Sequence, residues 1–91
     1  LAKLNEEIRG KLKDLNDFAF SHGKIPLKYK YLIAMAIDAS HGASEGVKAL
    51  ADEAIKNGAT MDEINEVLRI VLYMAGAGGI YPAAQGLKNL K

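Results

Sequence analysis

Apolar residues recur three or four positions apart along most of the chain. In residues 1–20 this spacing places apolar side chains on one face, whereas lysine, glutamate and aspartate fill the other: the apolar members are Leu1, Leu4, Ile8, Leu12, Leu15 and Phe18. No segment alternates apolar and polar residues with period two, so no strand is predicted. We therefore expect an all-α bundle of about five helices, with residues 1–91 forming a single domain built around a helical hairpin.

Short signals mark where the central helices begin and end. Ser44 is predicted to be the N-cap of the helix that follows it, because a serine hydroxyl can accept a bond from an amide of the first turn. Gly58 is expected to end that helix in the left-handed conformation. Thr60 and Glu63 have the spacing of a capping box, which predicts the next helix over residues 61–75. A last helix is expected to begin at residues 81–82, with Pro82 near its first position.

Two segments are apolar on every side, namely residues 31–37 and 70–75. Such helices are covered all round, either by their own chain or by another chain. Tyr73 lies in the second segment, and core packing with a partner for its hydroxyl is expected. Asp38 ends the run within a helix predicted over residues 27–40. Its carboxylate is expected to reach solvent, with a functional acid as the alternative.

Composition narrows the classes of function. The 91 residues are 49% hydrophobic, carry a formal net charge of +1 and include no cysteine. Balanced charge argues against nucleic acid or an anionic membrane as the main partner, and the longest apolar run is too short to span a bilayer. Without cysteine there is no disulfide framework, thiolate metal site or thiol nucleophile. No signal peptide pattern opens the sequence, so we expect a cytoplasmic protein. Its small size and apolar content predict a homo-oligomer.

Candidate chemistry gathers where the second helix gives way to the third. His41 and Glu45 are four residues apart, with Ser40 and Ser44 beside them. Histidine titrates near neutrality, so this pair could act as an acid–base couple or bind a carboxylate. The alternative is a polar turn between two helices. The only other histidine, His22, lies in a loop, and the spacing of the two predicts no metal site and no cofactor.

The order of these pieces resembles the carboxymuconolactone decarboxylase family, which shares its fold with the alkylhydroperoxidase AhpD. The resemblance rests on the run IPLKYKYLIAMAIDA, the helix end ALADEAIKNGAT and the segment MDEINEVLRIVLYMAGAGGIYPAAQGL. It implies an all-α fold that assembles as trimers or hexamers. The peroxidase branch uses CxxCxxxH and an upstream glutamate, and these four positions correspond here to Tyr31, Ala43, Gly46 and Leu50. Thiol peroxidase activity is therefore not expected.

The other branch decarboxylates a carboxylated lactone and needs a seat for the carboxylate and a proton donor. The resemblance thus implies a cofactor-independent decarboxylase of a small cyclic carboxylic acid or lactone, although many members carry histidine where this chain has Leu50. By chemistry alone, the candidate catalytic residues are His41 and Glu45, and those for binding a small acidic ligand are Ser44, Tyr73 and Tyr81. Two alternatives remain: a non-catalytic oligomeric protein for binding or scaffolding, and an enzyme that uses these tyrosines and His41 for another reaction.

Overall fold

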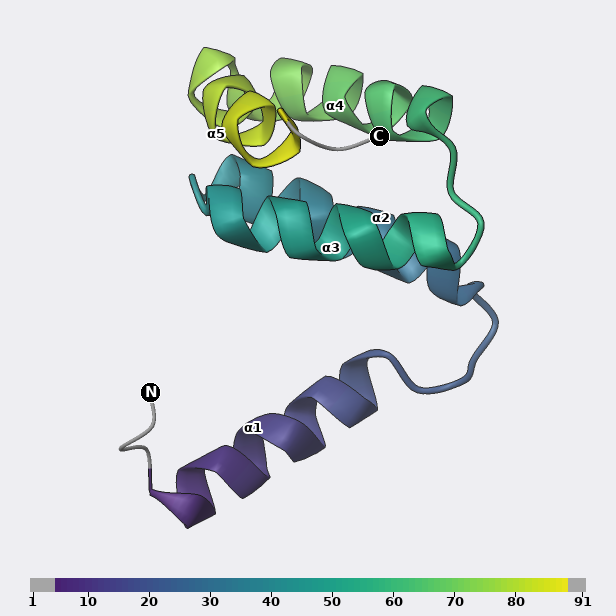
Figure 1. The fold of residues 1–91 in the computed structure, drawn as a ribbon, viewed down its shortest axis with the longest axis vertical. Coiled ribbons are helices and arrows are strands. Elements are labelled where there is room, and N and C mark those ends of the chain that lie inside the picture. Colours follow the sequence, from purple (N-terminus) through teal and green to yellow (C-terminus); the bar gives the residue numbers. More distant parts are fainter. Residues whose placement is uncertain (1–4, 89–91) are drawn as a thin grey trace.

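The computed structural model describes residues 5–88, which form five helices and no strand. The predicted all-α fold is therefore confirmed. Helices α4 and α5 lie in one layer above α2 and α3, whereas α1 runs away from both layers on the far side of α2 and α3 (Figure 1). The core sits between the two layers, and its buried members are Leu32, Met35, Ala39, Val47, Ala51, Ala54, Ala59, Ile64, Val71 and Ala83.

Helix α1 (Glu6–Ala19) is amphipathic, as predicted, and continues through Gly10. Its N-cap is Asn5, whose side chain accepts a hydrogen bond from the Glu7 N–H at 2.6 Å. None of its residues is buried. The predicted positions Leu1 and Leu4 lie outside the described residues. The sequence correctly predicts the helix, but its apolar stripe finds no cover within the described chain.

Helix α2 (Leu27–Ser40) has the predicted bounds, and only one side of it is buried. Leu32, Met35 and Ala39 face the core, whereas Ile33 and Ile37 remain 50% and 52% exposed. Helix α3 (Ser44–Lys56) packs beside it in the same layer (Figure 1). The expected all-round burial of α2 is not met inside this chain, which leaves one apolar side open.

The end of α3 is stabilised by a Schellman motif. Gly58 has φ 101°, in the left-handed region that disfavours a Cβ. Its N–H donates to the Ile55 carbonyl at 3.0 Å, and the Ala59 N–H donates to the Ala54 carbonyl at 2.9 Å. The predicted stop at Gly58 is confirmed.

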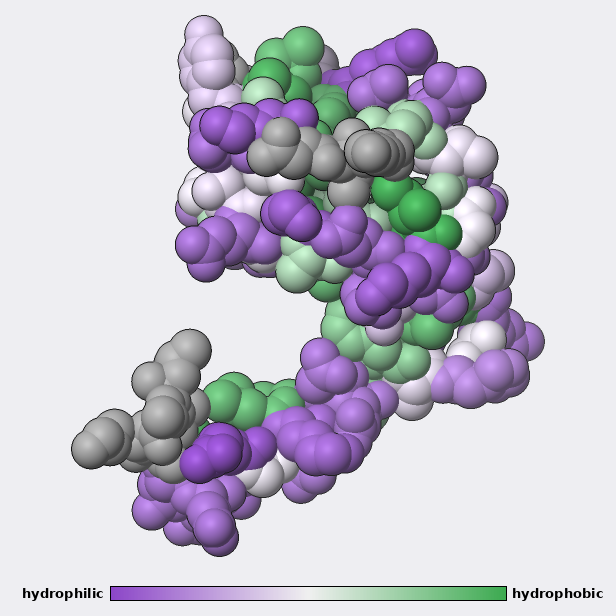
Figure 2. Space-filling view, in the orientation of Figure 1, coloured by the Kyte–Doolittle hydropathy of each residue, from purple (hydrophilic) through white to green (hydrophobic). Residues whose placement is uncertain are grey.

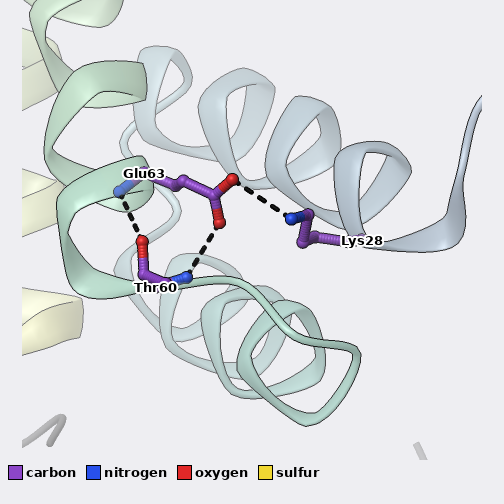
Figure 3. Close-up of polar contacts among 3 residues, drawn as sticks. All are labelled: Lys28, Thr60 and Glu63. Atoms are coloured by element: carbon purple, nitrogen blue, oxygen red, sulfur yellow. Dashed lines mark hydrogen bonds and ion pairs between the residues drawn. The ribbon is translucent and has the colours of Figure 1, made fainter.

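Helix α4 (Met61–Ala75) begins with the predicted capping box. The Glu63 N–H donates to the Thr60 hydroxyl oxygen at 3.1 Å, and the Thr60 N–H donates to the Glu63 carboxylate at 2.9 Å (Figure 3). Two amides at the start of the helix are thereby satisfied, which fixes where α4 starts relative to the end of α3.

Helix α5 (Ala77–Leu87) begins earlier than the sequence predicts. Gly76, with φ 69°, separates it from α4, and the glycine-rich segment that follows is helical. Pro82 consequently lies inside the helix instead of near its first position. The prediction was wrong because Gly76, with its positive φ, makes the break, so that the proline has no need to start a helix.

Small residues let α5 approach the other helices closely. A Cβ on Gly86 would collide with the carbonyl oxygen of Ser44 and lie 3.1 Å from the Val47 Cβ. A Cβ on Gly79 would lie 2.8 Å from the Val71 Cγ1. These glycines therefore set the distance of α5 from α3 and from α4. None of the helices within residues 5–88 combines the length and apolar character needed to cross a membrane.

Candidate functional site

The turn between α2 and α3 carries the residues that the sequence proposes for catalysis. His41 caps the C-terminus of α2, and its N–H donates to the carbonyls of Ile37 and Asp38, both at 3.1 Å. The N-cap of α3 is Ala43 and not Ser44, and no side chain caps this helix. The prediction for Ser44 was wrong by one position, because the Ala43 N–H is held by the Asp38 carbonyl at 2.9 Å and α3 starts directly after it.

The candidate side chains His41 and Glu45 are close in sequence but are not joined by a hydrogen bond or an ion pair in the described residues. His41 and Glu45 are both exposed. Across residues 5–88, neither side chain takes part in a hydrogen bond or ion pair with another residue. The Ser40 hydroxyl donates to the Ile37 carbonyl of its own helix at 2.7 Å. The arrangement is an accessible polar turn.

The sequence does not predict the contact that Asp38 makes with helix α3. Its side chain is half-buried and lies against Gly46 in the first turn of α3, so closely that a Cβ on Gly46 would collide with its carboxylate oxygen. The N-terminus of a helix favours negative charge. The carboxylate therefore does not simply reach solvent, as expected, but places its charge beside the start of α3.

The two tyrosines proposed for substrate binding lie on the surface. Tyr73 is 87% exposed near the end of α4, and Tyr81 is 74% exposed on α5. Core packing of Tyr73 was therefore a wrong prediction for the single chain: Val71 of the same helix faces the core, and Tyr73 points elsewhere. Pro82, next to Tyr81, comes close to Gly42 in the α2–α3 turn. The structure thus brings helix α5 close to the candidate residues of the α2–α3 turn. Within residues 5–88, however, neither Tyr73 nor Tyr81 forms a hydrogen bond with this turn.

The four positions that correspond to the peroxidase relay hold residues without a reactive side chain for a thiol relay. Tyr31 is half-buried, and its ring stacks on Phe20 with centroids 4.8 Å apart. Ala43 is the N-cap, Gly46 packs against Asp38, and Leu50 packs against the core. None of them supplies a thiol, an imidazole or a carboxylate. A thiol relay at the start of α3 is chemically impossible in this chain.

A groove lies elsewhere, between α2 and α4. This α2–α4 groove has a volume of about 600 Å³ and is lined by Tyr29, Leu32, Ile33, Ala36, Glu63, Glu66, Val67 and Ile70. Most of these side chains are apolar, and the two carboxylates lie at one end. Sequence analysis did not identify the groove, although the two segments that are apolar on every side, residues 31–37 and 70–75, signal an open apolar surface on α2 and α4.

An ion pair fixes the polar end of the groove. The Lys28 Nζ lies 3.1 Å from the Glu63 carboxylate (Figure 3). It also lies 4.8 Å from the centre of the Tyr29 ring. The N–H of Thr60 and then the Lys28 ammonium lower the pKa of Glu63, and the hydrogen bond to Glu63 raises the pKa of Lys28. Both groups are charged at neutral pH and already paired, so they serve the fold better than they would serve as an acid or base.

A comparison with protein families agrees with this architecture. The model of the carboxymuconolactone decarboxylase family matches residues 7–87, which span all five helices. The chain belongs to the carboxymuconolactone decarboxylase family. No curated protein and no solved structure matches it. Within this family, the chain combines the helical framework with an α3 start that lacks the thiol relay.

Proposed function

We propose that this chain is a non-catalytic, homo-oligomeric member of the carboxymuconolactone decarboxylase family that acts by binding or scaffolding. The observation that carries the proposal is the start of α3. Tyr31, Ala43, Gly46 and Leu50 stand at the four relay positions and offer no thiol, imidazole or carboxylate, and the Asp38 carboxylate already lies against the first turn at Gly46. A framework that keeps its helices but holds no reactive group at the four relay positions fits an assembly better than an enzyme.

Electrostatics also oppose a carboxylate substrate at this point. A second negative charge placed a few ångströms from Asp38 would be repelled, and at least part of that repulsion survives near a protein surface. His41 and Glu45 are exposed, so water screens whatever they could offer to a reacting group. Catalytic charge stabilisation works through fixed dipoles in a site that excludes water, and such a site is absent around these two exposed side chains.

The decarboxylase assay tests this directly. Purified full-length chain is given γ-carboxymuconolactone, and loss of the lactone chromophore is followed together with release of carbon dioxide. We expect the rate to equal that of the buffer blank. Sustained turnover that scales with protein concentration would overturn the non-catalytic proposal.

One observation favours a decarboxylase as the second candidate. No side chain caps α3, and amides in the first turn of a helix are natural donors to a carboxylate. In this version His41 donates the proton, Glu45 is its partner, and Ser44, Tyr73 and Tyr81 contact the ligand. Turnover that is lost in His41→Ala and retained in His22→Ala would establish this function, since His22 is an exposed histidine of the linker before α2.

Self-association is the other part of the proposal, and exposed apolar side chains support it. On α4 and α5, Ile70, Tyr73, Met74 and Tyr81 are all between 63% and 87% exposed. Large apolar patches of this kind mark interaction surfaces. Sedimentation velocity over a range of concentrations tests this part: we expect an assembly of defined stoichiometry, with the trimer or hexamer of the family as the first expectation. A monomer at all concentrations would contradict it.

A further inference from the structure

Helix α1 has an apolar stripe that nothing within residues 5–88 covers. The exposed fractions are 49% for Ile8, 52% for Leu12, 62% for Leu15 and 79% for Phe18. The space-filling view shows apolar side chains on the side of α1 that looks toward the hollow below the bundle (Figure 2). An isolated helix of this length is marginal in water. A 14-residue α1 therefore needs a surface to pack against.

The bundle offers a matching surface. Two further hollows adjoin the α2–α4 groove and share residues with it: Ile33 belongs to one, and Ala36 and Ile70 to the other, while Ile37 joins the two. The apolar surface is thus continuous along α2 and α4 and reaches Met74, which is 74% exposed. A groove between two helices is a usual docking place for the apolar face of a third helix.

The chain's own α1 is held away from this groove. The Phe20 ring stacks on Tyr31, and the Lys30 ammonium donates to the Ser21 carbonyl. The Phe20 N–H in turn donates to the Asn16 carbonyl at 3.0 Å, which continues α1 up to the stacked ring. These contacts tie the last turn of α1 to α2 and direct the helix away from the bundle (Figure 1). An α1 that lies in the groove must therefore come from another copy.

Charge fits this occupant. Glu66 lines the groove, and Lys11 lies one turn after Ile8 and one turn before Leu15, beside the stripe of α1. Within residues 5–88, neither Lys11 nor Glu66 forms an ion pair. A docked α1 brings the basic side chain of Lys11 to the edge of a groove in which Glu66 is acidic and forms no ion pair within residues 5–88. This charge complementarity favours the association of two copies.

The exposed area has the right size. The chain exposes 6612 Å² at a mass of 9.8 kDa, whereas a compact monomer of that mass exposes about 5,200 Å². The radius of gyration is 13.9 Å, compared with about 12 Å for a compact chain of this length. The excess of about 1,400 Å² per chain is more than the roughly 800 Å² that each partner contributes to a standard protein interface, so one chain has enough excess surface both to give one helix and to accept one.

We propose that α1 of one copy packs its apolar stripe into the α2–α4 groove of a second copy of this chain. The proposal rests on the self-association proposed above and specifies its contact. Because the two surfaces differ, the contact is heterologous, so it closes either as a reciprocal exchange or as a ring. Each copy gives one helix and accepts one.

Two single variants and their mixture test the exchange. Leu12→Glu disables the stripe, Ile70→Glu disables the groove, and each is followed by sedimentation velocity and far-UV circular dichroism. Burial of an unpaired carboxylate is costly, so we expect about 100-fold weaker self-association for each variant with the helical signal of the bundle retained. Gly10→Glu is the matched control, since it places the same carboxylate on α1 where a Cβ meets nothing within 4 Å; it should associate like the wild type.

Mixing the two disabled variants identifies the partner of α1. The Ile70→Glu chain keeps a working stripe and the Leu12→Glu chain keeps a working groove, so an equimolar mixture should form a heterodimer that neither variant forms alone. No complex in the mixture, or full association of either single variant, would overturn the exchange while leaving self-association through another surface intact. Lactone turnover would overturn only the non-catalytic function, so the two failures are distinguishable.

Discussion

Substitution of Gly86 by alanine probes the close approach of α5 to α3. An added Cβ would meet the carbonyl oxygen of Ser44, a backbone atom, and would lie 3.1 Å from the Val47 Cβ. Backbone atoms cannot rotate out of the way as a side chain can, so α5 must move outward. Overpacking of this kind costs about 1–3 kcal/mol, and an alanine in a helix returns about 1 kcal/mol relative to glycine.

We expect Gly86→Ala to lower the free energy of unfolding by about 2 kcal/mol, because a rigid contact places the cost at the upper end of that range. For a domain of this size, that corresponds to a fall in Tm of roughly 10 °C. Thermal unfolding followed by circular dichroism at one fixed protein concentration measures it, since assembly makes Tm depend on concentration.

Gly10→Ala is the control for helix propensity, because its Cβ meets nothing within 4 Å on α1. It should leave Tm unchanged or slightly raised. A Gly86→Ala chain that melts at or above the wild-type temperature would refute the close approach of α5 and α3, and with it the placement of α5 beside the α2–α3 turn.

Three further predictions follow from the polar contacts. Thr60→Ala should lower the free energy of unfolding in guanidinium by about 1 kcal/mol, with Thr60→Ser close to the wild type, because the hydroxyl caps α4; equal stability of all three would contradict the capping box. The pKa of Glu63 in the folded protein is held below its ordinary value of 4.5. The ionised Glu63 carboxylate therefore contributes to the free energy of unfolding above pH 4.5, and this contribution is lost as the pH falls through the folded-state pKa. The stability gap between wild type and Glu63→Gln should therefore narrow as the pH is lowered from neutrality to 3 (about one unit or more below the ordinary pKa), and a gap that widens would refute the assignment. Gly46→Ala should lower the free energy of unfolding by about 1–3 kcal/mol, and by less in an Asp38→Ala background, which lacks the carboxylate that the new Cβ would strike. A double-mutant cycle that shows no coupling between the two substitutions would contradict the contact between Asp38 and Gly46.

Helix ends were predictable where one short-range signal acts alone. The stop at Gly58 and the box of Thr60 and Glu63 depend on residues within one turn of each other, and the structure has both. Where two signals compete, the sequence favoured the wrong one. Pro82 and Gly76 can each mark the start of α5, and Gly76 does so because a positive φ ends α4 outright.

The candidate site was predictable only as a segment. The sequence correctly places His41 and Glu45 where the second helix gives way to the third, with His41 at the end of α2 and Glu45 in the first turn of α3. The partners of their side chains, however, depend on tertiary packing. Asp38 finds Gly46 because α2 and α3 pack against each other, and no short-range spacing encodes that contact. The prediction that Tyr73 packs in the core was wrong for the same reason. The sequence of a wholly apolar segment does not indicate which of its faces meets the core.

The all-apolar helices also connect the fold with the proposed assembly. The spacing of apolar residues predicts how much of the surface of α2 and α4 must be buried. The chain buries one side of each helix and leaves Ile33, Ile37 and Ile70 at least half exposed. The same chain has an equally uncovered stripe on α1 that its own contacts direct away from the bundle. In the proposed assembly, two complementary apolar surfaces that do not meet within one molecule would meet between molecules, and each new contact would leave a further stripe and groove open until the assembly closes. The spacing of apolar residues within each helix thus predicts how much apolar surface needs cover. In the proposed assembly, the direction in which residues 21–26 lead from α1 to α2 decides whether the same chain or another copy covers it.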